Sequence, residues 1–263
     1  MQSRSFTDIR YDAKDGVARI VIDRPHAYNA FTTRTVEELV TAFEHAERDA
    51  SVGVIVLTGA GDKAFCAGGD VKEAAGSGGY DREMDYWHSR LHHCMRSVSK
   101  PTIAAVNGYA IGGGHILHLL CDLTIACEEA KFGQAGPRVG SFDAGFGAAY
   151  LARAVGEKKA REIWFLCRQY SAREALEMGL VNKVVPRQQL DKEVDEWCRE
   201  ILAKSPFALK YLKKALNADT DHQWGFEEMA QSAVRLYWAS EEAQEAKEAF
   251  AHKRAPDFSR FRR

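Results

Sequence analysis

Apolar residues in the first two-thirds of the chain follow two patterns, which predict different elements. Short β-branched runs predict strands, and the run 52–58 is apolar almost throughout, as is typical of a strand buried on both faces. Spacings of i, i+3, i+4 and i+7 predict an amphipathic helix at Val36, Leu39, Val40 and Phe43. The predicted strands are 17–23, 52–58, 102–106, 122–127 and 180–185. Strands that alternate with helices predict βαβ units and mostly parallel pairing.

The pattern changes at about residue 190, after which only helical periodicity is found. Amphipathic segments are predicted at 194–203, 207–216 and 226–238. We therefore expect an α/β core over residues 1–188 and a helical region over residues 189–263. No sequence repeat of 20–50 residues is recognisable along the chain.

Composition excludes several function classes. The chain has 263 residues with 36 Lys and Arg against 37 Asp and Glu, so it lacks the basic excess that nucleic acid or an acidic membrane surface requires. No apolar stretch approaches the ~18 residues of a membrane span, and the first residues lack the apolar segment of a signal peptide. The six cysteines form no CxxC pair, which is typical of reduced core thiols. We expect a soluble cytoplasmic protein with no nucleic-acid or membrane partner.

Three glycine-rich stretches carry the candidate chemistry, at 64–70, 108–115 and 132–147. Glycines after strands let a ligand approach the backbone, and a glycine run at the start of a helix presents amide N–H groups. Two such amides from different loops can form an oxyanion hole. Ordinary turns are the alternative interpretation. A phosphate loop is less well supported, because neither GxGxxG nor GxxxxGK[ST] occurs in these stretches.

Four motifs in order resemble those of the crotonase (enoyl-CoA hydratase/isomerase) superfamily: AFCAGGD at 64–70, GYAIGGG at 108–114, CD at 121–122 and FGQ at 132–134. The resemblance implies an α/β fold with a crotonase-like spiral core of ββα turns and a C-terminal helical trimerisation region. It implies a homotrimer or hexamer that acts on acyl-CoA thioesters. The amides of Gly69 and Gly113 would then hold the thioester oxygen.

The residues at the general-acid and general-base positions distinguish the branches of the superfamily. Classical hydratases carry two glutamates where this chain has Ile116 and Gly136, so simple enoyl-CoA hydration is not expected. The segments 133–143 and 157–170 resemble 1,4-dihydroxy-2-naphthoyl-CoA synthases, which close a ring by a Dieckmann-type condensation. Their relatives, the 2-ketocyclohexanecarboxyl-CoA hydrolases, open a ring. Both reactions pass through a thioester enolate.

The resemblance also implies roles for individual residues. Asp143 and Ser141 would orient a second carbonyl and transfer protons, and Tyr80 would hydrogen-bond to the reacting centre. Gly136 would leave room where other members place a carboxylate, and bicarbonate bound by Gln134 and Trp164 would supply a base. No tightly bound cofactor and no metal are expected. Further contacts with substrate or CoA are expected from Ala64, Ala67, Gly68, Asp70, Val71, Tyr109, Gly112, Trp238 and Lys253.

Each candidate also has a structural interpretation. Asp143 could cap a helix that starts near Ala144, and Trp164 falls on an apolar helical stripe typical of a core residue. Ser141 and Tyr80 could be ordinary loop residues. His88 and His92, four residues apart, suggest a metal site, but no further ligand pattern accompanies them, and a polar helix face is the preferred interpretation.

Departures from the synthases leave the acyl group open. Val71 stands where both the synthases and the hydrolases have Gln, Tyr28 stands where the synthases have Arg, and the sequence at 74–76 lacks the synthases' Arg-Gly-Asp run. An isomerase or hydrolase that uses Asp143 alone, and a non-catalytic CoA-binding scaffold, are the alternative functions.

Overall fold

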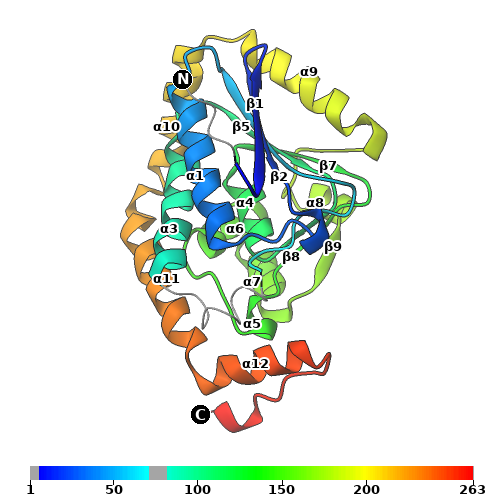
Figure 1. Ribbon diagram of the computed structural model, residues 1–263, viewed down its shortest axis with the longest axis vertical. Helices are drawn as coiled ribbons and strands as arrows, with labels where there is room; N and C mark the ends of the chain where they lie inside the picture. Colours follow the sequence, from blue (N-terminus) through cyan, green and yellow to red (C-terminus); the bar gives the residue numbers. More distant parts are fainter. Residues whose placement is uncertain (1–5, 71–81, 263) are drawn as a thin grey trace.

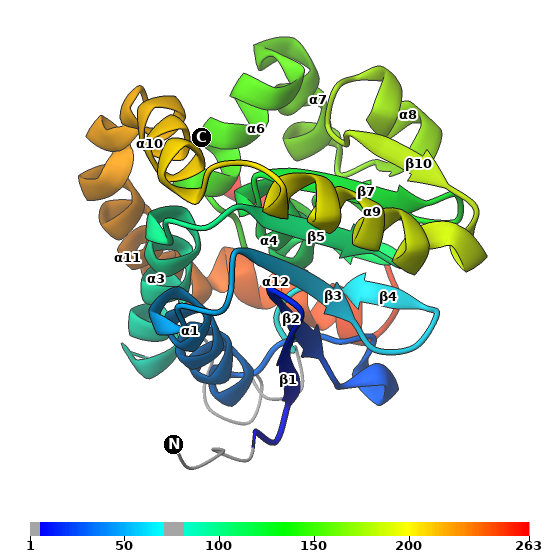
Figure 2. The ribbon, with the colours of Figure 1, turned by 90° about the horizontal axis from the view of Figure 1, so that it is seen from above.

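Two β-sheets form the centre of the protein (Figures 1 and 2). The computed structural model describes residues 6–70 and 82–262. Within these residues the larger sheet has the strand order β1-β2-β3-β5-β7-β10, and the smaller has the order β4-β6-β8-β9. Val71 and Tyr80, two of the candidate site residues, lie outside the described residues.

The larger sheet contains the five strands that the sequence predicts. They are β2 (Val17–Ile22), β3 (Val54–Gly59), β5 (Thr102–Val106), β7 (Leu123–Cys127) and β10 (Lys183–Val185). These five pair in parallel, as expected, and β1 (Ile9–Lys14) adds an antiparallel edge. All five residues of β5 are buried, because helices or the second sheet cover both faces of the strand.

The smaller sheet was not predicted, because its strands are only three residues long. They are β4 (Ala64–Cys66), β6 (Tyr109–Ile111), β8 (Lys131–Gly133) and β9 (Gln169–Ser171). The chain passes from the larger sheet to the smaller one and then into a helix three times: β3-β4-α3, β5-β6-α4 and β7-β8-α5. The helices are α3 (Arg82–Ser97), α4 (Gly113–Leu120) and α5 (Gly136–Val139). This repetition confirms the expected spiral of ββα turns.

Helices pack around the sheets on the outside of the spiral. The predicted helix at 36–43 is part of α1 (Thr33–Arg48), which begins at a capping box formed by Thr32 and Thr35 and lies beside α3 (Figure 2). The other helices are α6 (Phe146–Val155), α7 (Glu157–Leu166), α8 (Ala172–Glu177), α9 (Leu190–Leu202), α10 (Pro206–Ala218), α11 (Trp224–Trp238) and α12 (Glu241–Ala251). Short 3₁₀ turns occupy Pro25–Ala27, Arg187–Gln189, Asp221–Gln223 and Ser259–Phe261.

The helical C-terminal region is confirmed and is bonded to the core. Lys213 of α10 is buried, and its Nζ donates to Asp122 Oδ2 at 2.7 Å. The same carboxylate oxygen accepts from the backbone N–H and the hydroxyl of Thr102 at the start of β5. Farther along, α11 packs against α3, and α12 lies at the lower end of the molecule in Figure 1 and contacts α5 and α11. This route brings the last helices to the glycine-rich loops.

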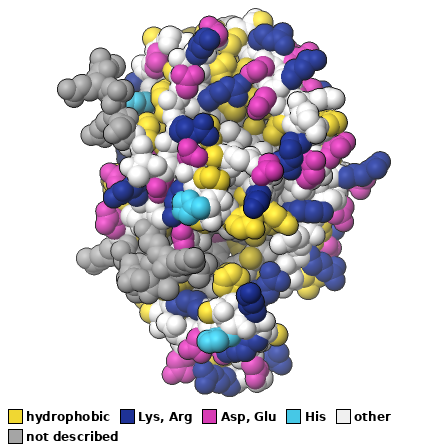
Figure 3. Space-filling view, turned by 45° about the vertical axis from the view of Figure 1, so that its right-hand side comes forward, with side chains coloured by type: hydrophobic (Ala, Val, Ile, Leu, Met, Phe, Trp, Pro, Cys, Tyr) yellow, Lys and Arg dark blue, Asp and Glu magenta, His cyan; other side chains and the backbone are white. Residues whose placement is uncertain are grey.

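The surface and the thiols agree with the composition. Positive and negative side chains are interspersed over the face shown in Figure 3. All six cysteines are buried and unpaired. Among the described helices, none combines the length and the apolar character needed to cross a membrane.

Candidate active site

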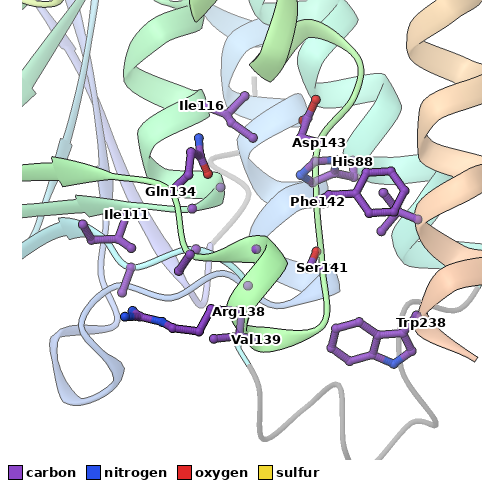
Figure 4. Close-up of a pocket in the computed structure, with 18 of the residues that line it drawn as sticks. His88, Ile111, Ile116, Gln134, Arg138, Val139, Ser141, Phe142, Asp143 and Trp238 are labelled. Carbon is purple, nitrogen blue, oxygen red and sulfur yellow. The ribbon is translucent and has the colours of Figure 1, made fainter. Parts of the chain in front are cut away.

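The three glycine-rich stretches meet around a cavity of about 300 Å³. Helices α3, α7, α11 and α12 complete its wall, so residues far apart in the sequence face the same space. Figure 4 shows Ser141, Phe142 and Asp143 along the segment after α5, with Gln134 and Ile116 across from Asp143. The candidate residues that line the cavity are Ala67, Gly68, Gly69, Asp70, Gly112, Gly113, Gln134, Gly136, Ser141, Asp143, Trp164 and Trp238.

Three candidate contacts lie outside the lining of this cavity. Ala64 is buried in β4, where its carbonyl accepts a hydrogen bond from the Asn29 side chain. Tyr109 lies on the surface with its ring edge-on to Tyr28. Lys253 follows α12 and is exposed. The cavity therefore includes the candidates for the acyl group but not these three.

Gly69 and Gly113, whose amides are the expected oxyanion-hole donors, lie on two loops that contact each other. A short parallel bridge joins Phe31 to Gly69, and its hydrogen bonds use the Gly68 carbonyl and the Asp70 amide rather than the Gly69 amide. Gly113 is the first residue of α4, where backbone N–H groups have no partner within the helix. A Cβ on Gly68 would lie 3.2 Å from the Gly113 nitrogen, so the two loops are in contact.

The two carboxylate oxygens of Asp143 have different surroundings. Its Oδ1 accepts from the amides of Gly145 and Gly147 at 2.9 and 3.0 Å, at the start of α6. Its Oδ2 is buried and has no hydrogen-bond partner in the described part of the chain. Burial and the nearby negative charge of Glu227 raise the pKa of Asp143 to about 6. One carboxylate oxygen therefore caps the helix while the other is available for proton transfer.

A buried ion pair from two other helices lies beside Asp143. His92 Nδ1 of α3 is 2.7 Å from Glu227 Oε1 of α11, and neither side chain is exposed. Gln231 donates to the same Glu227 oxygen, and the Phe146 amide donates to the other at 2.6 Å. Burial lowers the pKa of His92, but the charge of Glu227, its hydrogen bond to His92 and the charge of Asp143 together outweigh burial and leave that pKa raised. Burial raises the pKa of Glu227, but the charge of His92 and the three hydrogen bonds to the carboxylate together outweigh burial and lower that pKa.

The interpretation of His88 and His92 as a polar helix face is wrong. Both are buried, because α3 packs between α1 and α11 and turns these rings toward the cavity wall and Glu227. His92, Asp143 and Glu227 each offer a potential metal-ligand atom within 4.8 Å of the others. However, both Glu227 oxygens, His92 Nδ1 and Asp143 Oδ1 already take part in hydrogen bonds. This set acts as a hydrogen-bonded network rather than as an open ligand set.

Gln134 and Trp164 provide two buried donors on the same cavity. Neither Gln134 Nε2 nor Trp164 Nε1 has a hydrogen-bond partner within residues 6–70 and 82–262. A buried N–H without a partner costs about 1–3 kcal/mol, so these groups suit an acceptor ligand. Gly136 does not leave the expected room, because a Cβ there would lie 2.6 Å from the Ser141 carbonyl oxygen. The loop itself fills that space.

Comparison with known proteins decides the family. The family model for enoyl-CoA hydratase/isomerase matches residues 12–261. The chain belongs to the enoyl-CoA hydratase/isomerase family. Its fold is similar to carnitinyl-CoA hydratase from Mycobacterium avium, with 35% identity over 96% of this chain and 98% of that chain and a TM-score of 0.84. It is also similar to an enoyl-CoA hydratase/isomerase from Xanthobacter autotrophicus Py2, with 33% identity over 94% of both chains and a TM-score of 0.85.

As a crotonase-family protein, this chain is an enzyme that acts on acyl-CoA thioesters. Three of the four crotonase motifs contribute residues to the cavity lining, with Gly69 in the first and Gly113 in the second. The interpretation of Trp164 as a core residue is confirmed, since it is buried, and it lines the cavity as well. Trp238, one of the expected substrate contacts, also lines the cavity.

Sequence reasoning missed Glu227, His92 and Gln231 as residues of this crotonase site. A signal for two of them is present in the sequence. The buried face of α11 includes Glu227, Ala230, Gln231, Val234 and Trp238, so two polar residues occupy positions of an apolar helical stripe. Because buried charges need partners, a Glu on such a stripe predicts a buried polar contact. The identity of that contact depends on the packing of α3 against α11.

Proposed function

We propose that this enzyme stabilises a CoA-thioester enolate and makes or breaks a carbon–carbon bond next to the thioester. The single observation that supports this most strongly is the placement of Asp143. Its Oδ2 is buried without a hydrogen-bond partner among the described residues, and Asp143 lines the same cavity as Gly69 and Gly113. The position expected for a hydratase glutamate is occupied by Ile116, which cannot transfer a proton.

The proposed chemistry follows from the charges that develop. The amides of Gly69 and Gly113 donate to the thioester oxygen as it becomes an enolate, so the α-proton becomes easier to remove. With a pKa of about 6, Asp143 is mostly ionised at neutral pH and accepts that proton. The Ser141 hydroxyl lies on the same loop and orients a second carbonyl.

The direction of the reaction can be tested with two ring substrates. The purified enzyme is incubated with o-succinylbenzoyl-CoA and, separately, with 2-ketocyclohexanecarboxyl-CoA. The molecular masses of the products are then measured by mass spectrometry. Ring closure of the first removes one water, whereas ring opening of the second adds one. Hydrolysis to free CoA without any change in the carbon skeleton, or binding without turnover, would contradict the proposal.

Ring opening is the second candidate function. The synthases carry an Arg-Gly-Asp run near the acyl group, and this chain has Ala-Ala-Gly at 74–76. Without that arginine, a substrate with a free carboxylate has lost one possible cationic partner. A cyclic β-keto thioester has no such carboxylate, so this departure favours ring opening.

We also propose that a bicarbonate-sized anion binds between the donors of Gln134 and Trp164. Both N–H groups are buried on the cavity wall without a partner among the described residues, which fits an oxygen ligand. Bicarbonate held there would supply a base. No tightly bound organic cofactor and no metal are needed for the proposed chemistry.

Trp164→Phe should weaken this anion site while keeping the packing. Hydrogen bonds to charged groups contribute about 1.5–3 kcal/mol, so the bicarbonate concentration that gives half-maximal activation should rise about 10-fold or more. The measurement is turnover against bicarbonate, with chloride added to constant ionic strength. Trp197→Phe is the control, because Trp197 donates to Glu193 away from the cavity. An unchanged response in Trp164→Phe would overturn the anion proposal.

The enzyme is proposed to be a homotrimer or hexamer. Large apolar side chains are exposed on α10 and α11, including Phe207, Leu216 and Leu236. Apolar surface of this kind is typical of subunit interfaces. We expect the double variant Leu216→Glu/Leu236→Glu to sediment as smaller species than the wild type, and Leu176→Glu on α8 to sediment unchanged. A monomeric wild type in analytical ultracentrifugation would contradict the proposal.

A further inference from the structure

Two carboxylates from distant parts of the chain share the N-terminus of α6. Asp143 Oδ1 accepts from the amides of Gly145 and Gly147, and Glu227 Oε2 accepts from the amide of Phe146 between them. The positive end of the helix therefore faces two acidic groups at once. Glu227 comes from α11, so its packing against α6 and α3 determines the surroundings of Asp143.

Glycines make this close approach possible. A Cβ on Gly145 would lie 1.8 Å from Glu227 Oε2, and a Cβ on Gly147 would lie 2.8 Å from Asp143 Cγ. No side chain fits at either position without moving a carboxylate. The sequence at this helix start is therefore adapted to hold both acids side by side.

His92 balances the negative charge of the two acids. It is buried, forms the ion pair with Glu227, and its Nε2 has no hydrogen-bond partner among the described residues. The ring centroids of His88 and His92 are 4.2 Å apart. Burial and the charge of His92 lower the pKa of His88 to about 3, so His88 is neutral. Ile116 of α4 is apolar, and Arg138 of α5 borders the cavity but points away from Asp143 (Figure 4).

We propose, building on the role of Asp143 given above, that Glu227 and His92 are positioning residues. The pair holds Asp143 in place and determines which of the two carboxyl groups carries a proton. With one imidazole for two carboxylates, only one acid can be ionised at no net buried charge. Glu227 is the ionised acid, because three donors form hydrogen bonds to its carboxylate. Asp143 is therefore the acid that gains and loses the proton near neutral pH.

Two isosteric variants should move the titration of Asp143 in opposite directions. Glu227→Gln leaves one carboxylate for one imidazole, so the pH midpoint should fall by about one unit or more. His92→Gln leaves two carboxylates with no cation, so the midpoint should rise by about one unit or more. A purely structural role would not shift the midpoint in opposite directions.

The titration can be measured in two ways. The first is the pH profile of deuterium exchange at the α-carbon of butanoyl-CoA, which requires enolate formation but no ring chemistry. The second is infrared difference spectroscopy of the protonated carboxyl group, assigned by its loss in Asp143→Asn. The infrared measurement needs no activity, so it tests the positioning pair even if the proposed reaction is wrong. Conversely, exchange that survives in Asp143→Asn would overturn the proposed function alone.

Matched controls use exposed residues of the same type. Glu228→Gln changes the next residue of α11, and His252→Gln changes an exposed histidine, and both should keep the wild-type midpoint. If a single variant fails to fold, the double variant Glu227→Gln/His92→Gln removes both charges. Its midpoint should lie between those of the two single variants, because the two charges act on Asp143 in opposite directions. Unchanged midpoints in the folded variants would overturn the inference.

Discussion

Asp143→Asn should lower the rate of enolate formation about 100-fold or more while leaving acyl-CoA affinity nearly unchanged. Asparagine keeps the shape and the Oδ1 acceptor that receives the Gly145 and Gly147 amides, but it cannot accept a proton on the other side. In the wild type, activity should rise with pH through an acid limb near pH 6, where Asp143 ionises. This limb should disappear in the variant. Turnover and calorimetric thioester binding measure the two effects.

The pH dependence of stability distinguishes proton transfer by Asp143 from a role in helix capping alone. Because the folded-state pKa of Asp143 is raised, the unfolded chain loses its proton first as the pH rises. The contribution of this group to stability therefore falls between about pH 4 and pH 6. Asp143→Asn should lose that pH dependence and remain folded. If the variant instead unfolds, with full activity per folded molecule, Asp143 is only a cap, worth ~1 kcal/mol.

The second large effect is the expected absence of crotonyl-CoA hydration. General acid and base groups supply about 10²–10⁴-fold each, and both positions that carry glutamate in classical hydratases lack one here. Ile116 is apolar and Gly136 has no side chain. Hydration should therefore be far below the ~1–10³ per second of a typical enzyme, as followed by loss of enoyl absorbance.

Restoring one glutamate should not restore hydration. A side chain at Gly136 would meet the Ser141 carbonyl at 2.6 Å, so Gly136→Glu requires the loop to move. Ile116→Glu is the better-tolerated variant, because it changes a side chain that already lines the cavity. Wild-type hydration of crotonyl-CoA at an ordinary enzymatic rate would show that the argument from these two positions is wrong.

The sequence by itself determined the main sheet and most helices. The strands 102–106 and 17–23 are β-branched apolar runs, and such runs form buried strands wherever the chain can cover both faces. The same local logic found α9, α10 and α11 from their apolar stripes. The second sheet was not found, because three-residue strands such as Ala64–Cys66 have no period to detect. The ββα repetition lies in the topology rather than in a sequence repeat.

The sequence also predicted some features of the candidate site, whereas others depended on the tertiary structure. Glycine stretches after strands pointed to exposed backbone amides, because strand ends and helix starts are local features, and the resemblance to the crotonase superfamily then singled out Gly69 and Gly113. Only the tertiary structure decided that His92 and Glu227, 135 residues apart, form an ion pair beside Asp143. The expected polar face of α3 is buried, because α11 packs against it and removes water, and a charge buried there needs an opposite charge beside it. A pairing of this kind has no signature in local spacing.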